Sequence, residues 1–579
     1  MAADDDVHPI ALLTEEIKSD EVETRIKAMR RLKTVAQALG AERTRSELVP
    51  FLREATEDED EVLVALAEEL GAFVELVGGP QHATVLVEPL EVLAAVEETV
   101  VRDRAVDSLL KVVAVLTSVG DTFGPLIKRL AEGDWFTSRV SACSLFAAVY
   151  PKITDSGRRK ELRDLFQILT NDDTPMVRRA AASNVGKFAA TLEKEHITTL
   201  VIPLFKALTA DDQDSVRLLA IENSAMIAKL LTPEENTQHV LPIVRSSVED
   251  RSWRVRFSIA KDFFPLSEAM GQQITESELL ACFTNLLQDG EAEVRAASAK
   301  NIAGYITVVR NELFTNDILP LLSTLSQDTA PNVRTAVSIA CMELAPRLGE
   351  AASKTSLAPL LLLFLRDEVV DVRLNILKRL GALSPWMASF ESVLLPAIAD
   401  LARDLQWRVR EAVILSVPAL AGSLGNQYFQ EHLLEIYMNA FSDMVGEVRL
   451  SATKILPQLL ESVGSDYILQ NIVPRLTQIF DRSIIYQERV NVLHALKQLA
   501  SDKATTELLG TMIALAVRGA RDKIPNVRFV ACMTLEQLCK FADQSIVAGQ
   551  VRPCLSEMVN DSDADVKYYS SLALDAVQG

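Results

Sequence analysis

Two short segments place a tryptophan between polar and cationic neighbours. They are SWRVRFSIA at residues 252–260 and QWRVREAVI at residues 406–414, so Arg254 follows Trp253 and Arg408 follows Trp407. A large apolar ring beside a guanidinium suits a partner surface with an acidic rim better than it suits a core. The chemistry that these residues offer is recognition, because a tryptophan buried on association is a typical binding hot spot.

Residues able to do catalytic or metal chemistry are present but have no matching spacing. The chain contains no HExxH, no Gly-rich phosphate loop and no GxSxG. The cysteines lie in apolar helical stretches without CxxC pairs, so we expect reduced core residues. The sequence therefore predicts a protein that is not an enzyme and needs no cofactor or metal. The residues concerned are His8, His82, His196, His239, His432 and His494, with Cys143, Cys282, Cys341, Cys532, Cys539 and Cys554.

Composition narrows the class of protein further. The 579 residues are 49% hydrophobic and 24% charged, which predicts a folded, soluble chain with a large interior. A formal charge of −21 argues against nucleic-acid binding, which requires a concentrated basic surface. We expect no apolar run to approach the roughly 18 residues of a membrane span, and the start lacks a secretory signal. The sequence therefore predicts no membrane insertion and a cytoplasmic, also nuclear, location.

The tryptophan segments belong to a repeat that runs through the chain. A Val-Arg pair, or a degenerate form of it, recurs fifteen times, and ten of the fourteen intervals are 39 residues. The second residues of these pairs are Arg25, Leu63, Arg102, Arg139, Arg178, Arg217, Arg256, Arg295, Arg334, Arg373, Arg410, Arg449, Arg489, Arg528 and Lys567. The sequence therefore predicts one solenoid over residues 1–579, with 15 repeats of about 39 residues.

Two further columns keep the same phase and predict the elements of each repeat. Asp stands five residues before Val in most repeats, as in Asp211, and Pro stands 12 to 14 residues before it, as in Pro203. Each repeat should be a Pro-bent helix, a polar turn and a second helix that the Asp caps. The Asp and Arg columns either form a ladder between neighbouring repeats or are solvated charges, since exposed pairs contribute only about 0–1 kcal/mol.

The repeat at residues 200–231 shows why many copies are needed. Its first helix should bury one face and its second helix another, and neither is long enough to cover its own stripe. Stacking on the next pair completes the core. The residues expected on the two faces are Leu200, Leu204, Ala207 and Leu208, then Val216, Leu219, Ala220, Ile227 and Leu230.

Two-helix repeats with this pattern resemble HEAT repeats, which implies an all-α, right-handed α-α superhelix of horseshoe shape. Segments such as ERTRSELVPFL, GDWFTSRVSAC, DDTPMVRRAAAS and LLPAIADLARDLQWRVREA go beyond the repeat consensus. They resemble the 65-kDa scaffold (A, PR65-type) subunits of protein phosphatase type 2A, along the whole chain. The resemblance implies a non-catalytic scaffold. It would hold the phosphatase catalytic subunit on the repeats of residues 391–579 and an exchangeable regulatory B-type subunit on the repeats of residues 8–310.

The resemblance also implies which turn residues bind each partner. Those on the regulatory side are Glu97, Glu98, Trp135, Phe136, Pro175, Met176, Arg179, Asp214, Ser215, Ser252, Trp253 and Arg254. Those on the catalytic side are Trp407, Arg408, Tyr486 and Arg489. The pattern departs from the family at Gly446, where an aromatic is expected, and in the irregular turn DRSIIYQERV of repeat 13.

Two other classes of HEAT-repeat protein are alternatives. A nuclear transport receptor is also an acidic solenoid, but is usually longer and less regular, with an acidic insert that this sequence lacks. A chromosome-organising subunit should carry basic grooves, which the net charge opposes. A turn tryptophan that only packs on the adjacent repeat is the structural alternative to a partner contact.

Overall fold

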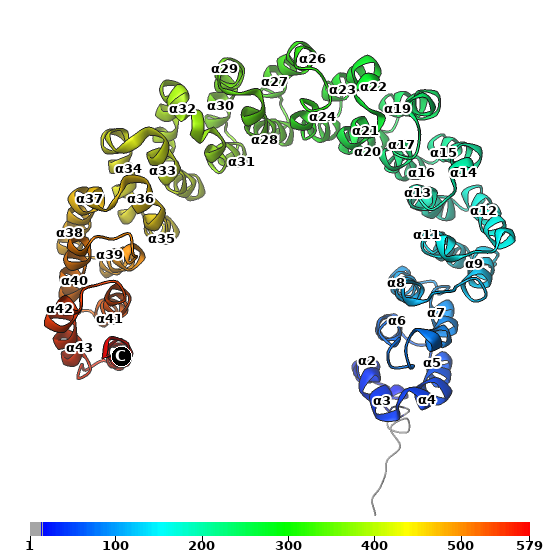
Figure 1. The fold of residues 1–579 in the computed structure, drawn as a ribbon, viewed down its shortest axis with the longest axis horizontal. Coiled ribbons are helices and arrows are strands. Elements are labelled where there is room, and N and C mark those ends of the chain that lie inside the picture. The colour runs from blue at the N-terminus through cyan, green and yellow to red at the C-terminus, as the bar shows by residue number, and fades with distance from the viewer. Residues whose placement is uncertain (1–12, 14, 579) are drawn as a thin grey trace, which may run out of the picture. The chain divides into compact units, whose positions relative to one another are not determined.

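The computed structural model describes residue 13 and residues 15–578, and these residues form helices joined by short turns, with no strand among them. The chain divides into two compact units, residues 1–294 and 295–579, which we call unit 1 and unit 2. In each unit, taken by itself, the first helices of the repeats form one layer and the second helices form the other (Figure 1). The predicted all-α solenoid is therefore confirmed.

Unit 1 holds repeats 1–7 and the start of repeat 8; residues 1–12 and 14, which precede the second helix of repeat 1, lie outside the described range. The other first helices are α4 (Ala41–Arg43), η1 (Thr44–Leu48) and α5 (Val49–Glu54); η2 (Pro80–Leu86) and α7 (Val87–Leu93); α9 (Phe123–Ala131); α12 (Ser156–Thr170); α14 (Lys194–His196), η4 (Ile197–Val201) and α15 (Ile202–Thr209); α18 (Pro233–Glu235), η5 (Asn236–Val240) and α19 (Leu241–Val248); and α22 (Gln272–Ile274), η6 (Thr275–Leu279) and α23 (Leu280–Leu287). The second helices are α2 (Val22–Arg30) and α3 (Leu32–Leu39); α6 (Asp60–Leu70); α8 (Thr99–Val115); α10 (Phe136–Cys143), α11 (Phe146–Val149) and η3 (Tyr150–Lys152); α13 (Pro175–Ala189); α16 (Asp214–Ile221) and α17 (Ser224–Ala228); and α20 (Trp253–Lys261) and α21 (Phe263–Met270).

Unit 2 holds the rest of repeat 8, whose helix α24 (Ala292–Ala299) crosses the boundary before α25 (Ile302–Tyr305), and repeats 9–15. The first helices are α26 (Asn311–Leu313), η7 (Phe314–Ile318) and α27 (Leu319–Leu325); α29 (Glu350–Ala352), η8 (Ser353–Leu357) and α30 (Ala358–Leu365); α32 (Met387–Leu401); η10 (Phe429–Leu433), α34 (Leu434–Asn439) and η11 (Ala440–Ser442); α37 (Ser465–Tyr467), η12 (Ile468–Ile472) and α38 (Val473–Arg482); α40 (Thr506–Gly519); and α42 (Gln544–Ile546), η13 (Val547–Val551) and α43 (Arg552–Met558). The second helices are α28 (Pro331–Leu348); α31 (Val370–Leu377) and η9 (Leu380–Trp386); α33 (Trp407–Tyr428); α35 (Gly446–Lys454) and α36 (Leu456–Val463); α39 (Tyr486–Leu499); α41 (Pro525–Cys539); and α44 (Ala564–Gln578).

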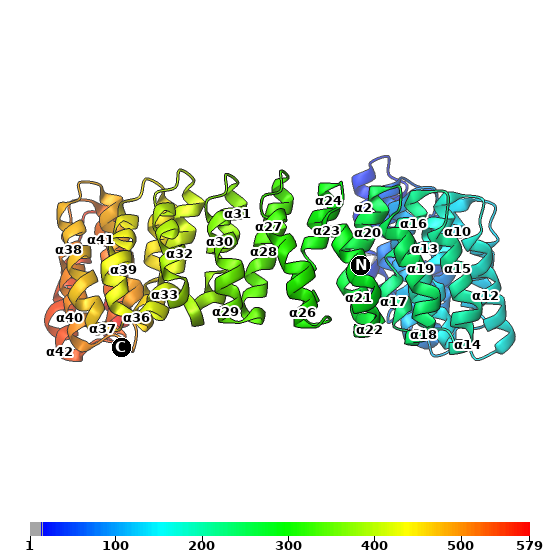
Figure 2. The same cartoon turned by 90° about the horizontal axis from the view of Figure 1, so that it is seen from above.

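The helices stand side by side, so the turns inside the repeats line one edge. Figure 2 shows this in unit 2, where α26 and α29 begin their repeats at one edge and α24 and α31 begin the second helices at the other. The packing agrees with the view, because α33 contacts α31, α35 and α36 of the neighbouring repeats. The horseshoe shape of the whole chain concerns both units together and stays a prediction.

The bend in the first helices is real but does not need proline. A π-helical segment precedes the proline in several repeats, for example Ile197–Val201 before Pro203. Proline removes one backbone donor and favours such a local widening. The same segment occurs before Leu280 and before Leu434, where no proline follows. The π segment therefore does not depend on proline, and the first helices α9, α12, α32 and α40 do without this segment.

The predicted core of the repeat at residues 200–231 is confirmed in part. Leu204, Leu208, Val216, Ala220 and Ile227 are buried as expected, but Leu200, Leu219 and Leu230 are only half-buried and Ala207 is exposed. The first helix instead buries Ile197, Val201, Ile202 and Phe205. Ala207 lies outside the stripe that Leu204, Phe205 and Leu208 form, so the misplaced residues are at the edges of the buried faces.

Two composition-based expectations fare differently. Five of the cysteines are buried and Cys539 is half-buried, and all six are free thiols, as predicted. We expected no segment long and apolar enough to span a membrane. That expectation is wrong for Leu380–Leu401, which is long and apolar enough by length and composition alone. That segment comprises η9 and α32, and α32 packs against α30 and α33. A single such segment is weak evidence for a span, since core helices share this composition.

Candidate functional site

A ladder of ion pairs runs along the turns of each unit. Arg410 donates from Nε to Asp443 Oδ2 at 2.7 Å and from Nη2 to Oδ1 at 2.8 Å, while its Nη1 donates to the carbonyl of Asp404 at 2.8 Å. Each such Arg thus joins the backbone of its own turn to the carboxylate of the next repeat. The pairs in unit 1 are Arg139–Asp172, Arg178–Asp211, Arg217–Asp250 and Arg256–Asp289. Those in unit 2 are Arg295–Asp328, Arg334–Asp367, Arg373–Asp404, Arg410–Asp443, Arg489–Asp522 and Arg528–Asp561.

The ladder Asp does not cap the second helix, contrary to prediction. Asp443 Oδ1 accepts a hydrogen bond from Val445 N at 2.8 Å, and Val445 is itself the N-cap residue of α35, without a side-chain cap. The Asp lies two residues too early for an N-cap and forms an Asx turn instead. Its position fixes the turn and leaves the rest of the carboxylate facing the previous repeat, where Arg410 binds it.

Burial and electrostatics exclude the alternative of independent solvated charges. The Arg410 and Asp443 side chains are 16% and 12% exposed. Hydrogen bonds from Arg410 lower the pKa of Asp443, against the effect of burial, and those bonds in turn raise the pKa of Arg410. Bidentate, part-buried pairs of this kind are stronger than surface pairs. The ladder gives the turns a rigid frame on which exposed side chains are presented.

Arg25 has Glu57 at the Asp position and pairs with the following residue, Asp58, at 3.0 Å. At two further turns an Arg is present, but the Asp position holds no acid and the rung is missing. Arg102 has Gly133 at the Asp position; its Nη2 instead donates to Thr99 Oγ1 at 3.1 Å. Arg449 has Ser483 at the Asp position, and its Nε is buried without a hydrogen-bond partner among the described residues. The irregularity noted in the sequence of repeat 13 is therefore a loss of one rung.

The structure places both Trp-Arg pairs at the start of second helices. The Arg408 guanidinium carbon lies 4.8 Å from the centroid of the Trp407 ring, and that of Arg254 lies 5.8 Å from the Trp253 ring. Trp253 is 39% exposed, whereas Trp407 is half-buried, so each ring is partly packed and partly available. A cation over a tryptophan face is attractive and holds the ring in one orientation.

Several predicted regulatory-side residues form one cluster in unit 1. Ser252 Oγ donates to Asp214 Oδ2 at 2.9 Å, and Arg254 Nη1 lies 3.9 Å from the same oxygen. Trp253 packs edge-on against Phe257 at 6.3 Å between centroids. Ser215 lies half-buried beside this cluster in the chain. The turns of two neighbouring repeats therefore share a polar network beneath an exposed aromatic ring.

A second group lies on the turn of repeat 5. Pro175 and Met176 are exposed, and Arg179 Nη1 lies 3.4 Å from Met176 Sδ. The Nε atom of Arg179 is buried without a partner in the described residues. Arg179 is therefore held against its own turn rather than extended into solvent.

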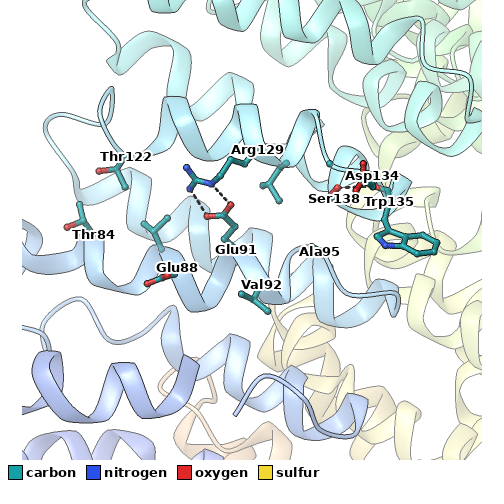
Figure 3. A pocket seen from close by; sticks show the side chains of 13 residues that line it. Thr84, Glu88, Glu91, Val92, Ala95, Thr122, Arg129, Asp134, Trp135 and Ser138 are labelled. Atoms are coloured by element: carbon teal, nitrogen blue, oxygen red, sulfur yellow. Dashed lines mark hydrogen bonds and ion pairs between the residues drawn. The ribbon is translucent and has the colours of Figure 1, made fainter. Parts of the chain in front are cut away.

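The most exposed tryptophan lies beside a cavity in unit 1. Trp135 is 76% exposed, and the cavity of about 740 Å³ next to it lies between α7, α9 and the start of α10. In Figure 3 Arg129 and Glu91, which both line the cavity, point toward each other and are joined by hydrogen bonds of 2.7 Å, and Trp135 projects at one end. Phe136 is half-buried. Glu97 and Glu98 are exposed, and Glu98 also caps α8 through Val100 N at 3.3 Å.

On the catalytic side, the two remaining predicted residues differ in availability. Tyr486 begins α39, is half-buried and lines a cavity between the second helices of repeats 12–15. Arg489 bonds to Asp522 in the ladder at 2.8 Å, and its side chain is only 14% exposed. Its cation is already paired, so a role for Arg489 in partner binding stays a prediction.

Sequence reasoning missed the most exposed apolar side chains of the chain. Leu405, Met444 and Ile484 are 97%, 96% and 95% exposed, and each follows the Asp position of its repeat. We call these three residues the apolar row. In the other repeats the residue after the Asp position is polar or glycine, for example Asp212 or Thr329. A comparison of this position between repeats could therefore have identified the three apolar residues from the sequence. Adjacent exposed apolar residues on a rigid edge are typical of an interaction surface.

Comparison with known proteins assigns the relatives of this chain. A family model described as PPP2R1A-like HEAT repeat matches residues 272–349. The beta isoform of the human protein phosphatase 2A 65 kDa regulatory subunit is 55% identical over 192 residues, 33% of this chain and 32% of the relative. A probable phosphatase PP2A regulatory subunit of Caenorhabditis elegans is 53% identical over 195 residues, 33% of each chain, and the Dictyostelium discoideum phosphatase 2A scaffold subunit is 48% identical over 203 residues, 34% and 35%. Over these segments the chain is similar to the phosphatase 2A regulatory and scaffold subunits.

Each alignment spans about a third of the relative's length, 32% to 35%. The family model covers repeats 8 and 9 and contains none of the predicted contact residues. Among solved structures, Kap121p bound to Nup53p is similar at a TM-score of 0.52 and 14% identity, over 98% of this chain and 66% of the other. The karyopherin Kap121p bound to the C-terminus of Cdc14p is similar at 0.51 and 13%, over 98% and 67%. At such identity these likenesses show the fold alone.

Proposed function

We propose that this chain is a non-catalytic scaffold subunit of a serine/threonine phosphatase of type 2A. The observation that carries the proposal is the turn edge of unit 2, where the apolar row and the Trp407–Arg408 pair stand on a ladder of ion pairs. A rigid row of exposed apolar side chains beside a tryptophan has the composition of a hot spot for a protein partner. The relatives are named as regulatory and scaffold subunits of phosphatase 2A, which supports the choice of partner.

Two separate ranges of repeats are proposed to hold different partners. The catalytic subunit docks on residues 391–579, through Trp407, Arg408 and the apolar row, with Tyr486 and Arg489 nearby. A regulatory B-type subunit docks on residues 8–310, of which 8–12 and 14 lie outside the described residues. Its contacts are the Trp253 cluster, the repeat 5 turn and the region of Trp135. The scaffold acts in the cytoplasm and also in the nucleus, without membrane insertion or nucleic-acid binding.

The scaffold needs no chemistry of its own. Its contribution is to hold the catalytic subunit near the regulatory one, which raises the effective concentration of a substrate bound by the regulatory subunit. Small rotations at the repeat interfaces add along a solenoid, so the distance between partners adjusts by flexing of the array. Catalysis is assigned entirely to the bound catalytic subunit.

Co-purification with identified partners tests this proposal. The tagged full chain should retain a phosphatase catalytic subunit from lysate, and the purified chain should not hydrolyse phosphopeptides by itself. Capture of a small GTPase of the nuclear transport cycle instead would favour a transport receptor, and capture of DNA-associated coiled coils a chromosome subunit. Metal-dependent hydrolysis by the purified chain would contradict a non-catalytic role.

A further inference from the structure

The broken rung in unit 2 leaves an arginine arranged for a carboxylate. Arg449 Nη1 donates to the carbonyls of Asp443 at 2.6 Å and Met444 at 3.2 Å, as Arg410 Nη1 donates to Asp404 and Leu405. In Arg410, the Nε and Nη2 edge binds the Asp of the next repeat. In Arg449, Nε is buried without a hydrogen-bond partner within the part of the chain that the structure describes. An unsatisfied buried donor is costly, and one on a cation especially so.

Ser483 keeps one function of the ladder Asp and lacks the other. Its Oγ accepts from Ile485 N at 3.1 Å, as Asp522 Oδ1 accepts from Ile524 N at 2.9 Å. Its carbonyl accepts from Arg489 Nη1 at 2.8 Å, as that of Asp522 accepts from Arg528. The turn of repeat 13 therefore has the ladder geometry. A serine hydroxyl carries no charge, so the turn forms but the ion pair to Arg449 does not.

Arg449 also lines an open cavity of about 710 Å³ between α35, α39, α41 and α44. A Cβ built on Gly446 would lie 3.5 Å from Arg449 Nη2, so glycine keeps the space beside the guanidinium uncrowded. At neutral pH the other charged lining residue is Glu447, which bonds to Lys454 at 3.2 Å. Burial, and then Lys497, lower the pKa of the lining His494, which is therefore neutral at that pH. The cavity thus presents a cation that forms no ion pair with a carboxylate of the described residues; Asp443, which is already bonded to Arg410, attracts it only from a longer distance.

The position of this cation connects it to the proposed docking surface. Met444 and Ile484 of the apolar row belong to the two turns on either side of the broken rung. A protein that covers both side chains passes directly over the place where the other repeats carry their carboxylate. Bidentate binding by arginine is specific for planar carboxylates, and all ten Arg–Asp rungs of the two units use one.

We propose that Arg449 is a carboxylate-binding residue and that an Asp or Glu side chain of the protein docked on the apolar row completes the rung between repeats 12 and 13. The identification of that protein as the phosphatase catalytic subunit rests on the proposed function. The partner's carboxylate bonds to the Nε and Nη2 edge of Arg449 after a small shift of the side chains that cover Nε. The rung then forms only in the complex, so this joint becomes stiffer on binding.

The decisive variant is Ser483→Asp, which supplies the carboxylate from the chain itself. It should raise the unfolding temperature of the free chain and weaken binding of the catalytic subunit by about tenfold, because the internal carboxylate competes with the partner's. Arg449→Gln should lower the affinity about as much without the gain in stability. Ser483→Ala and Arg482→Gln, which alter the same turn without touching the Arg449 pair, should stay within about twofold in affinity.

A titration of the free full-length chain separates this proposal from the identity of the partner. With N-acetyl-aspartate methylamide as probe, the methyl signals of Ile484 and Ile485 should shift in the wild type and not in Ser483→Asp or Arg449→Gln. Wild-type chain that responds to the probe but does not bind the catalytic subunit would overturn the proposed function alone. No response to the probe, or Ser483→Asp that is stabilised yet keeps the wild-type affinity for the catalytic subunit, would overturn the carboxylate site.

Discussion

Arg410 and Asp443 lie 33 residues apart in the chain and meet through two hydrogen bonds of 2.7 and 2.8 Å. The separation is close to one repeat, so the pair joins neighbouring turns without any long-range folding of the chain. Its recurrence gives each unit a line of fixed points along its turn edge. The exposed residues proposed to bind partners stand between these points.

The first prediction is that one rung contributes to local stability more than an exposed pair does. Asp443→Asn should destabilise the region of α33 and α35 by about 1–3 kcal/mol, between the values for surface and buried pairs. Hydrogen exchange of these two helices measures the effect where global unfolding of a repeat array is not two-state. Glu447→Gln, which breaks the exposed pair with Lys454, is the matched control and should change exchange little.

The second prediction concerns acid. The pKa of Asp443 and that of Asp561 are lowered, first by hydrogen bonds from Arg410 and Arg528. A carboxyl group with a lowered pKa stabilises the fold above its unfolded value of about 3.9 and loses that contribution as the pH falls through its folded value. Wild type should therefore exceed Asp443→Asn in stability at pH 7, with a gap that narrows below about pH 4. A gap that is constant with pH in urea denaturation would show that Asp443 acts only through its turn hydrogen bond.

The sequence alone predicts those features of the fold that are periodic and misses those that are not. The Val-Arg and Asp columns repeat at one phase, so their spacing predicted the helix pairs and the number of pairs. The same spacing left two alternatives for the Asp and Arg side chains, a ladder of ion pairs or solvated charges. Ala207 was misplaced because alanine is small and apolar enough for either side of a helix, so its type does not show that Leu204, Phe205 and Leu208 form the buried face. The Asx turn was missed because capping and turn formation use the same residue type two positions apart.

The candidate site was predictable in part for the same reason. Trp135, Trp253 and Trp407 stand out in composition, and the structure places each at the start of a second helix. Leu405, Met444 and Ile484 are ordinary apolar residues, and only their exposure marks them. That exposure depends on the turn geometry which the ladder fixes, so the apolar row required coordinates or a column-by-column comparison.

The third prediction tests the division of partners. Trp407→Ala should weaken binding of the catalytic subunit by about 2–4 kcal/mol, and Trp253→Ala should weaken binding of a regulatory subunit by a similar amount. Each variant is titrated with both partners beside a melting curve. Trp386→Ala, which removes the half-buried tryptophan of η9 away from the turn, is the matched control. Equal loss of both partners with a lower melting temperature would mean that the rings only pack on adjacent repeats.

The fourth prediction concerns the apolar row, where stability and binding separate most cleanly. Met444 and Ile484 are 96% and 95% exposed, so replacing either by Glu removes almost no buried contact and should leave the melting curve unchanged. If a partner covers the row, the same change places a charge in a desolvated interface and should cost about 2–5 kcal/mol of affinity for the catalytic subunit. Thr329→Glu makes the matched change at the same register position of repeat 9, outside the proposed docking residues, and should leave that affinity unchanged. An equal loss in all three variants would reflect general charge repulsion with an acidic partner, and no loss in Met444→Glu and Ile484→Glu would mean that the catalytic subunit does not dock on the row.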